Sequence, residues 1–208
     1  MENTCIIHDD AGQCIIIDPG CSEKHEQEEL AGFIRDKGLK PMRLIQTHCH
    51  LDHVMGSRWV AGRYGLILEM HELDLPLLES ATVIGESYGV RVDPPPKPGK
   101  FLIESDTVEF GKTSLEVIFT PGHAPGHICL YCKSSGFVIV GDVLFRGSIG
   151  RYDFPLSNYA DLMHSITGKL FLLPDETVVY PGHGPTTTIG EEKRTNPFIM
   201  EYLERSLR

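Results

Sequence analysis

The sequence predicts an α/β protein made of two similar halves whose sheets stack face to face, with helices on the outside. In each half of the 208-residue chain, short apolar runs typical of strands come first and helical patterns follow. A segment with four prolines, residues 92–99, forms a stiff linker between the halves. Several apolar runs end in a histidine or an aspartate, as expected where strand ends converge on a site. We therefore expect one domain, 1–208, with halves of about 1–93 and 100–208.

The first half opens on a predicted hairpin, in which apolar runs at 5–8 and 14–17 flank the turn-like residues 9–12. A helix is expected to follow from about Ser22 to Gly38, because serine favours the start of a helix and glycine its end. The other predicted elements of this half are a strand that runs into Thr47, a helix over 54–64, a strand over 66–68 and a short helix over 71–78.

The second half is predicted to hold closely spaced strands and two helices. The strands lie near Val108 and over 115–119, 128–131, 137–140 and 178–180, and the helices lie near 159–170 and 198–207. Cys129 and Cys132 form a C-x-x-C pair within one of these strands. Residues three apart in a strand face opposite sides of a sheet, so we expect the two thiols to share no metal or redox role.

The composition excludes some classes of partner. The formal net charge of −10 argues against nucleic acid, since proteins that bind its backbone usually carry a basic surface. No apolar run approaches the ~20 residues that span a membrane, and the first residues lack the features of a signal peptide. The six cysteines form no obvious disulfide framework. We therefore expect a cytoplasmic protein with neither nucleic acid nor membrane as a partner, and its oligomeric state stays open.

One short segment concentrates most of the chemistry. Three imidazoles and one carboxylate fall within six positions, directly after an apolar strand; they are His48, His50, Asp52 and His53. Packing explains such a cluster poorly, whereas neutral imidazole and carboxylate are the usual ligands of zinc, iron and manganese. One such ion takes three or four of these groups, so the cluster and its distant partners suffice for two ions.

Three further candidates occupy the same setting. His123, Asp142 and His183 each follow an apolar strand and lie in a turn rich in glycine or proline. Sites in layered α/β proteins gather at strand ends, where loops converge. We therefore predict a two-metal hydrolytic site that combines these residues with the cluster at 48–53.

With these motifs the chain resembles the metallo-β-lactamase superfamily over nearly its whole length. The motifs occur in order: Asp18-Pro19-Gly20, His48-x-His50-x-Asp52-His53, Thr120-Pro121-Gly122-His123, Gly141-Asp142 and Pro181-Gly182-His183-Gly184-Pro185. The resemblance implies the four-layer αβ/βα sandwich of that family. It also implies a first metal ion held by His48, His50 and His123, a second held by Asp52, His53 and His183, and Asp142 as the bridge between them.

Within the family, the chain is similar to the short, single-domain bacterial members of the type II glyoxalase group. The similarity lies in the complete His-x-His-x-Asp-His set and in segments 120–127, 141–151 and 190–198. It implies a thioester substrate such as a hydroxyacylglutathione. Larger glyoxalases add a C-terminal helical domain that helps to hold glutathione, and relatives often have a strand ahead of the segment at Asn3. We expect no such domain here, which leaves glutathione recognition open, and whether the N-terminal strand is missing stays open as well.

The implied reaction is attack of a metal-bridging hydroxide on an acyl carbonyl, with one metal ion stabilising the oxyanion. A thiol leaving group has a reference pKa near ~8.5, so it departs without a dedicated general acid. Asp142, as the bridge, and Asp52, which can orient the nucleophile, are the expected catalytic carboxylates. We expect two divalent ions per chain, with zinc favoured over iron or manganese.

Other polar residues near the motifs receive supporting roles. His127 is expected to support the ligands from behind, and Asp18 is expected to anchor its turn. The candidate contacts to a small-molecule thioester substrate are Arg151, Tyr152, Lys193 and Arg194, each weighed against an ordinary surface charge or hydroxyl. The loops at 79–100 and 144–160 are expected to shape the pocket.

Three other functions use the same residues. A mononuclear iron persulfide dioxygenase shares the fold and much of the ligand set, and it would hold one iron in place of two zinc ions. A lactonase or other ester hydrolase would use the same two-metal site. A metal-holding scaffold without activity is disfavoured by the intact set of seven ligands, and replacement of Asp142 would distinguish it from a catalyst.

Overall fold

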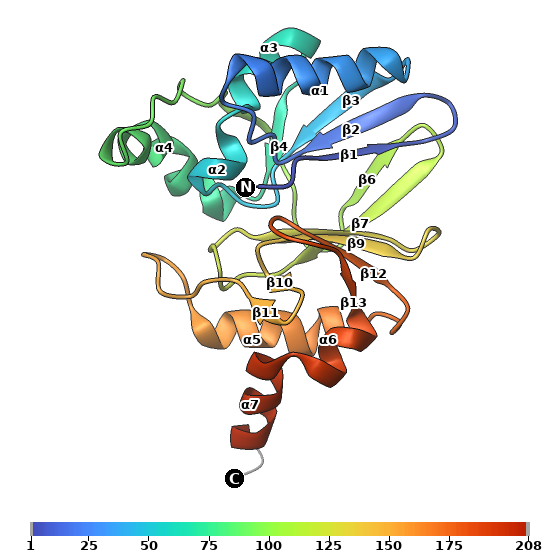
Figure 1. Ribbon diagram of the computed structural model, residues 1–208, viewed down its shortest axis with the longest axis vertical. Coiled ribbons are helices and arrows are strands. Elements are labelled where there is room, and N and C mark those ends of the chain that lie inside the picture. Colours follow the sequence, from blue (N-terminus) through green and yellow to red (C-terminus); the bar gives the residue numbers. More distant parts are fainter. Residues whose placement is uncertain (1, 207–208) are drawn as a thin grey trace.

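The computed structural model describes residues 2–206 and places two mixed sheets face to face, with helices on both outer sides (Figure 1). The first sheet has five strands in the order β1 (Cys5–His8), β2 (Gln13–Ile17), β3 (Lys40–Ile45), β4 (Leu68–Met70) and β5 (Pro98–Phe101). The second has six, in the order β13 (Thr187–Thr188), β12 (Val178–Pro181), β9 (Phe137–Gly141), β8 (Ile128–Cys132), β7 (Thr113–Phe119) and β6 (Thr107–Phe110). The predicted four-layer sandwich is confirmed.

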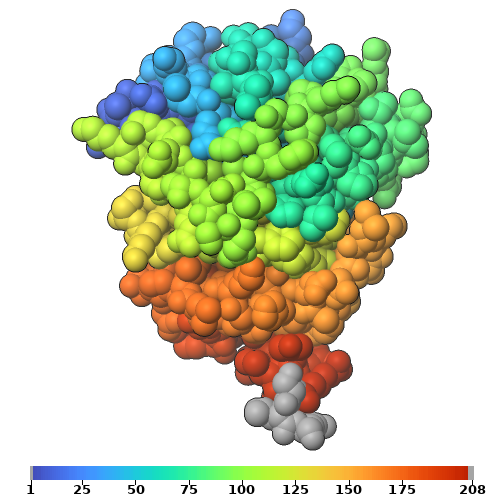
Figure 2. Space-filling model, turned by 180° about the vertical axis from the view of Figure 1, so that it is seen from behind, coloured from blue at the N-terminus to red at the C-terminus, as the bar shows by residue number. Residues whose placement is uncertain are grey.

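The helices form the two outer layers. The first sheet is accompanied by α1 (Lys24–Asp36), α2 (Leu51–Val54), α3 (Ser57–Tyr64), the 3₁₀ turn η1 (Glu72–Asp74) and α4 (Leu75–Ser87). The second is covered by α5 (Tyr159–Gly168), η2 (Leu170–Leu172) and α6 (Ile189–Thr195), and α7 (Pro197–Ser206) extends beyond α5 and α6. From behind, α7 projects from the end of the molecule beyond the second half (Figure 2). None of these helices is long and apolar enough to cross a membrane.

The buried side chains sort into three clusters that follow from strand alternation. Ile15 and Ile17 pack between the two sheets, whereas Ile16 packs between the first sheet and its helices. In the second sheet Cys132 faces the other sheet and Cys129 faces the helices. The prediction that this C-x-x-C pair points to opposite sides is therefore confirmed. All six cysteines are free.

Several predicted boundaries are wrong, each for a local reason. Helix α1 is capped by Glu23, not Ser22, because Glu23 and Glu26 form a reciprocal capping box. The helix predicted over 54–64 is two helices, with Gly56 between them. The Gly56 N–H donates to the carbonyl of Pro19 at 2.7 Å, and a side chain at 56 would overlap Cys21.

Other expected elements are longer, shifted or additional. The strand expected at 66–68 is β4, two residues later, and the short helix expected at 71–78 is η1 followed by the longer α4. Strand β5 pairs with β4, so the first sheet extends past the linker and the halves meet after Phe101. The hairpin β10 (Leu144–Phe145) and β11 (Ser148–Ile149), like β13 and α6, is too short to show a period in the sequence.

The topology brings strand ends from both sheets to one edge. Strands β2, β3 and β4 are mutually parallel in the first sheet, and β9 and β12 are parallel in the second. The loops that follow these strands carry most of the predicted ligands. Because the carboxyl ends of parallel strands lie on one edge of a sheet, stacking the two sheets brings these loops together.

Candidate metal centre

All seven predicted ligands gather in the cleft between the sheets. His48, His50, Asp52 and His53 follow β3, and the last three of them belong to the start of the short helix α2. His123 follows β7, Asp142 follows β9 and His183 follows β12. Each of the two halves therefore contributes ligand candidates, and neither half contains the whole set.

The donor atoms fall into two groups joined by Asp142. In the first, His50 Nδ1 lies 2.8 Å from His123 Nε2, which is 3.6 Å from Asp142 Oδ2. In the second, His183 Nε2 lies 3.1 Å from Asp52 Oδ2 and 3.5 Å from Asp142 Oδ2. Asp142 Oδ1 is also 3.5 Å from His53 Nε2.

Two of the compact donor sets have the composition of first-row metal sites. His48, His50 and His123 offer donor atoms that all lie within 4.8 Å of one another, and so do Asp52, His53 and His183. Asp18, His48 and His53 also form such a set. The carboxylate of Asp18, however, already accepts two hydrogen bonds from Thr47. The Thr47 backbone N–H donates at 2.7 Å and the Thr47 hydroxyl donates at 2.5 Å.

Unsatisfied buried atoms show that these residues fit a metal. Within the described chain, His48 Nε2, His53 Nε2 and Asp142 Oδ1 are buried and none makes a hydrogen bond of normal geometry, although the last two face each other at 3.5 Å. A buried polar atom without a partner costs about 1–3 kcal/mol, so three of them facing one cleft are unfavourable in a purely structural cluster. Cations bound by the two donor sets would satisfy all three.

Neighbouring polar groups orient the imidazoles with Nε2 toward the cleft. His123 Nδ1 donates to the carbonyl of Arg151 at 2.8 Å, and His53 Nδ1 lies 3.2 Å from Asp18. His48 Nδ1 lies 3.1 Å from the Thr47 hydroxyl. Bonds of this kind from the far ring nitrogen fix the tautomer and the ring direction of a metal ligand.

His127 lies behind the cluster and positions Asp142. Its Nε2 accepts the backbone N–H of Asp142 at 3.1 Å, and its Nδ1 lies 3.1 Å from the Thr120 hydroxyl. The Nε2 atom is therefore an acceptor, which places the ring proton on Nδ1. Its ring also stacks on that of His48, with centroids 4.9 Å apart.

Burial and mutual proximity set the charges of the cluster. Burial lowers the pKa of His48 well below its usual range and that of His50 to about 3, so both rings are neutral at physiological pH. Burial raises the pKa of Asp142, but interaction with His53 outweighs it and the net pKa lies below the ordinary value. Neutral imidazoles beside ionised carboxylates are the protonation states that metal binding requires.

His53 behaves differently from the other rings. Burial disfavours its charged form, yet its contacts with Asp142 and Asp18 raise its pKa well above the usual range. Without a metal, one proton on His53 thus compensates part of the negative charge of the cluster. A metal ion competes with that proton for the same ring.

The cluster opens into a cavity of about 320 Å³ whose walls are partly apolar. Besides His50, Asp52, His123, Asp142 and His183, it is lined by Phe145, Arg151 and Phe154. These last three come from the segment 144–160, which was expected to shape the pocket. None of the described residues in the segment 79–100, which was also expected to shape the pocket, lines this cavity.

The candidate substrate contacts separate into two groups. The Arg151 guanidinium lies over the Phe154 ring at 4.0 Å and pairs with Asp153 beside the cavity. Tyr152 packs on Tyr159 and is not among the lining residues. Lys193 and Arg194 both pair with Asp175. Asp175 precedes β12 whereas His183 follows it, so these two cations lie at the opposite end of the strand from the cluster.

The structure adds a buried acid that supports the ligand loop. Asp74, at the end of η1, accepts the backbone N–H of Cys49 at 2.8 Å and that of Gly126. It therefore holds the chain between His48 and His50 against the loop that contains His123. A lone aspartate in a predicted helix gives no sign of this role in the sequence.

We expect Asp74 to make stability depend on pH. Burial raises its pKa from 3.8 to about 6, although two N–H donors oppose the shift. The stabilisation from its proton is fully present below the unfolded pKa of 3.8 and is lost as the pH rises through about 6. Relative to Asp74→Asn, the metal-depleted wild type should lose about 3 kcal/mol of unfolding free energy across this window.

Urea unfolding of both proteins at several pH values measures this difference. Asp93→Asn, which makes the same substitution at an exposed position, provides the control. A constant difference between Asp74→Asn and the wild type would contradict the expectation.

Taken together, the fold and the cluster define an αβ/βα sandwich with a His/Asp centre of metal-binding type. The family model of the metallo-beta-lactamase superfamily matches residues 1–183. The chain therefore belongs to the metallo-β-lactamase superfamily, and it is a member of a family of metallo-hydrolases.

Individual relatives agree with this assignment. The probable metallo-hydrolase YqgX of Bacillus subtilis (strain 168) is 38% identical over 93% of this chain and 90% of its own length. The hydroxyacylglutathione hydrolase GloC of Haemophilus influenzae is 37% identical over 96% of this chain and 93% of its own. The crystal structure of TTHA1623 in a di-iron-bound form is 40% identical with a TM-score of 0.85, and the match covers 95% of this chain and 94% of that one.

Proposed function

We propose that the protein is a binuclear metal-dependent hydrolase that cleaves a thioester of the hydroxyacylglutathione type. The observation that carries the proposal is the convergence of three unsatisfied buried atoms. Two of them, on His48 and His53, belong to one compact donor set each, and the third, on Asp142, lies between those sets. Similarity to the hydrolase GloC supports the thioester as the substrate class.

In this proposal each donor set holds one divalent ion. His48, His50 and His123 hold the first, Asp52, His53 and His183 hold the second, and Asp142 contacts both. Bound there, such ions supply Lewis-acid polarisation of an acyl carbonyl and a water molecule of lowered pKa. We propose zinc as the native metal, and the di-iron form of TTHA1623 makes iron the first alternative to test.

The side chains around the cavity prepare the substrate for this chemistry. The rings of Phe145 and Phe154 form apolar walls that keep the acyl group away from bulk water. Asp52 is half-exposed and accepts from His183, so one carboxylate oxygen remains available to orient a nucleophilic water. The leaving thiol is a good leaving group near neutral pH, which agrees with the absence of a further acid among the described lining residues.

Arg151 is the residue we propose to bind a carboxylate of the thiol part. Arg151→Ala should raise KM for S-lactoylglutathione by roughly 10–100-fold with little change in kcat, because a charge-assisted hydrogen bond contributes about 1.5–3 kcal/mol. Steady-state kinetics measure the two constants separately. Arg146→Ala, at an exposed arginine on the same loop but outside the cavity, is the control. An equal change in both variants would remove Arg151 from the substrate site.

Hydrolysis of S-lactoylglutathione by protein of known metal content tests the proposed function. Turnover that requires two ions per chain and disappears in the metal-stripped protein is the expected result. Absence of turnover with two ions bound would exclude this thioester and leave lactones and other esters as substrates. A single bound iron with oxygen-dependent consumption of a persulfide would instead establish the dioxygenase alternative.

We propose that a small-molecule substrate is the only partner that the cleft requires. We also propose that the protein is located in the cytoplasm. The cavity of about 320 Å³ suits part of a small molecule and is too small for a folded partner.

A further inference from the structure

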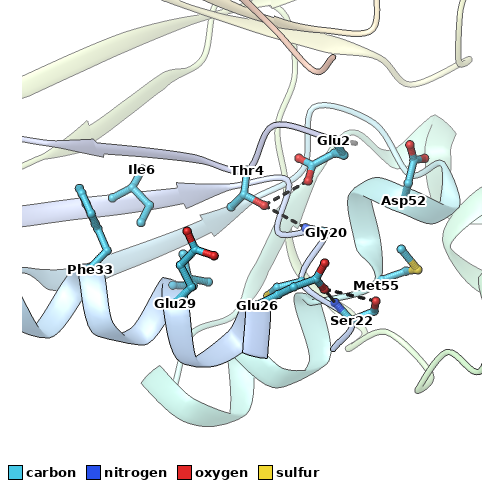
Figure 3. Close-up of a pocket in the computed structure, with 12 residues that line it drawn as sticks. Glu2, Thr4, Ile6, Gly20, Ser22, Glu26, Glu29, Phe33, Asp52 and Met55 are labelled. Carbon is cyan, nitrogen blue, oxygen red and sulfur yellow. Dashed lines mark hydrogen bonds between the residues drawn. The ribbon is translucent and has the colours of Figure 1, made fainter. Parts of the chain in front are cut away.

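The residues at the start of the described chain connect the two halves beside the candidate centre. The backbone N–H of Asn3 donates to the carbonyl of Gly182 at 2.7 Å, and Glu2 forms an isolated β-bridge with His183. On the other side, the hydroxyl of Thr4 accepts the backbone N–H of Gly20 at 3.1 Å (Figure 3). Residues 2–4 thus contact a turn of the first half and the His183 loop of the second.

The side chain of Asn3 makes the most specific of these contacts. Its amide nitrogen donates to the carbonyl of Pro181 at 3.2 Å and to that of Gly184 at 2.8 Å. With the backbone hydrogen bond to Gly182, Asn3 donates to three carbonyls that flank His183 in the chain. A carboxamide has two N–H donors for this purpose, and a carboxylate of the same shape has none.

The carbonyl groups of the His183 loop depend on hydrogen-bond donors from outside the loop, because the loop has few backbone N–H groups of its own to donate. Pro181 and Pro185 lack an N–H, and Gly184 has a positive φ of 76°. Of the remaining N–H groups, that of Gly182 donates to Gly141 at 2.7 Å. The space is also narrow, because a side chain at 182 would overlap the carboxylate of Asp142 and the ring of His53.

We propose that Asn3 is a positioning residue for His183 and thereby sets the affinity for the second of two metal ions. This inference rests on the proposed binuclear site and deepens it. Asn3 makes no contact of this kind with the first donor set, whose rings are oriented by Thr47 and by the carbonyl of Arg151. Removing the side-chain amide of Asn3 should therefore change the affinity for one ion only.

Cobalt titration of the metal-depleted protein tests this proposal through binding and visible spectra. Asn3→Asp keeps the shape but replaces the N–H donors with an anion that faces two carbonyls. It should weaken one binding step, the same step that His183→Ala weakens, by roughly 10–100-fold, as loss of a group that orients a ligand does, and leave the other step within about threefold. Asn3→Ala should show the same selective loss.

Two further variants separate positioning from general destabilisation. Ile199→Ala removes buried volume from α7 at a residue outside both donor sets, and should lower the unfolding midpoint without changing either cobalt affinity. His183→Ala should weaken the second step, and adding Asn3→Asp to it should weaken that step no further, because both changes act through one ring.

The proposal is overturned if Asn3→Asp leaves both binding steps unchanged, or weakens both equally, or adds its full effect to His183→Ala. Wild-type protein that binds only one cobalt ion would overturn it together with the binuclear site. A wild type that binds two ions but cleaves no thioester would contradict the proposed substrate alone, and the Asn3 comparison would proceed unchanged.

Discussion

Replacing Asp142 by alanine is expected to lower kcat/KM for the thioester by at least roughly 10³-fold. Asp142 contacts both donor sets, through His123 and His183 on Oδ2 and through His53 on Oδ1. Its loss would remove the group that, in the proposed function, holds both cations, and would leave the facing imidazoles without a shared anion. Metal centres of this kind contribute several kcal/mol of transition-state stabilisation, which corresponds to that loss of rate.

Steady-state kinetics together with metal analysis of the purified variant measure this effect. Asp93→Ala, which removes an exposed carboxylate of the linker, is the matched control and should retain full activity. Activity of Asp142→Ala within tenfold of the wild type would refute the proposed role of the carboxylate. Unfolding by urea should be recorded as well, to show that the variant is folded when its activity is measured.

The second large effect is expected from Gly122→Ala, and it falls on stability. Gly122 has a φ of 134°, and a Cβ there would overlap the backbone of Leu162 in α5. Its carbonyl also accepts the N–H of Asn158 at 2.7 Å, at the residue that caps this helix. Relief requires α5 to move away from the loop that carries His123, so we expect a loss of more than about 3 kcal/mol in unfolding free energy.

Gly136 offers a control that separates the steric overlap of an added Cβ from the preference of a positive φ for glycine. It also has a positive φ, of 65°, but nothing lies within 4 Å of its ideal Cβ. Gly136→Ala should therefore cost only about 1–2 kcal/mol in the same urea titration. If the two variants were equally stable, packing of α5 against residue 122 would not be a determinant of the fold.

The ligand candidates were predictable because their residue types and their settings repeat. His48, His123 and His183 each follow an apolar strand, and parallel strands must end on the same edge of their sheet. The layered architecture was predictable for a related reason, since alternating apolar residues such as Ile15 to Ile17 require burial on both faces of a sheet.

The surrounding contacts were not predictable, because they depend on tertiary placement. Asp74 and Asn3 lie far in sequence from the loops that they hold, and neither belongs to a local pattern. The same reason explains Lys193 and Arg194, which are cations near a motif in sequence but pair with Asp175 at the far end of β12. Short elements such as β10 and β13 exist only because neighbouring strands complete their hydrogen bonds.

The division of donors between the two sheets has a consequence for synthesis of the chain. The first half delivers His48, His50, Asp52 and His53 early, but each donor set still lacks a member until His123 and His183 have been made. A nascent chain therefore carries a partial, low-affinity site for most of its elongation. In the proposed binuclear site, tight binding would begin only when β12 joins the second sheet, so full metal retention would report that both halves have folded and docked.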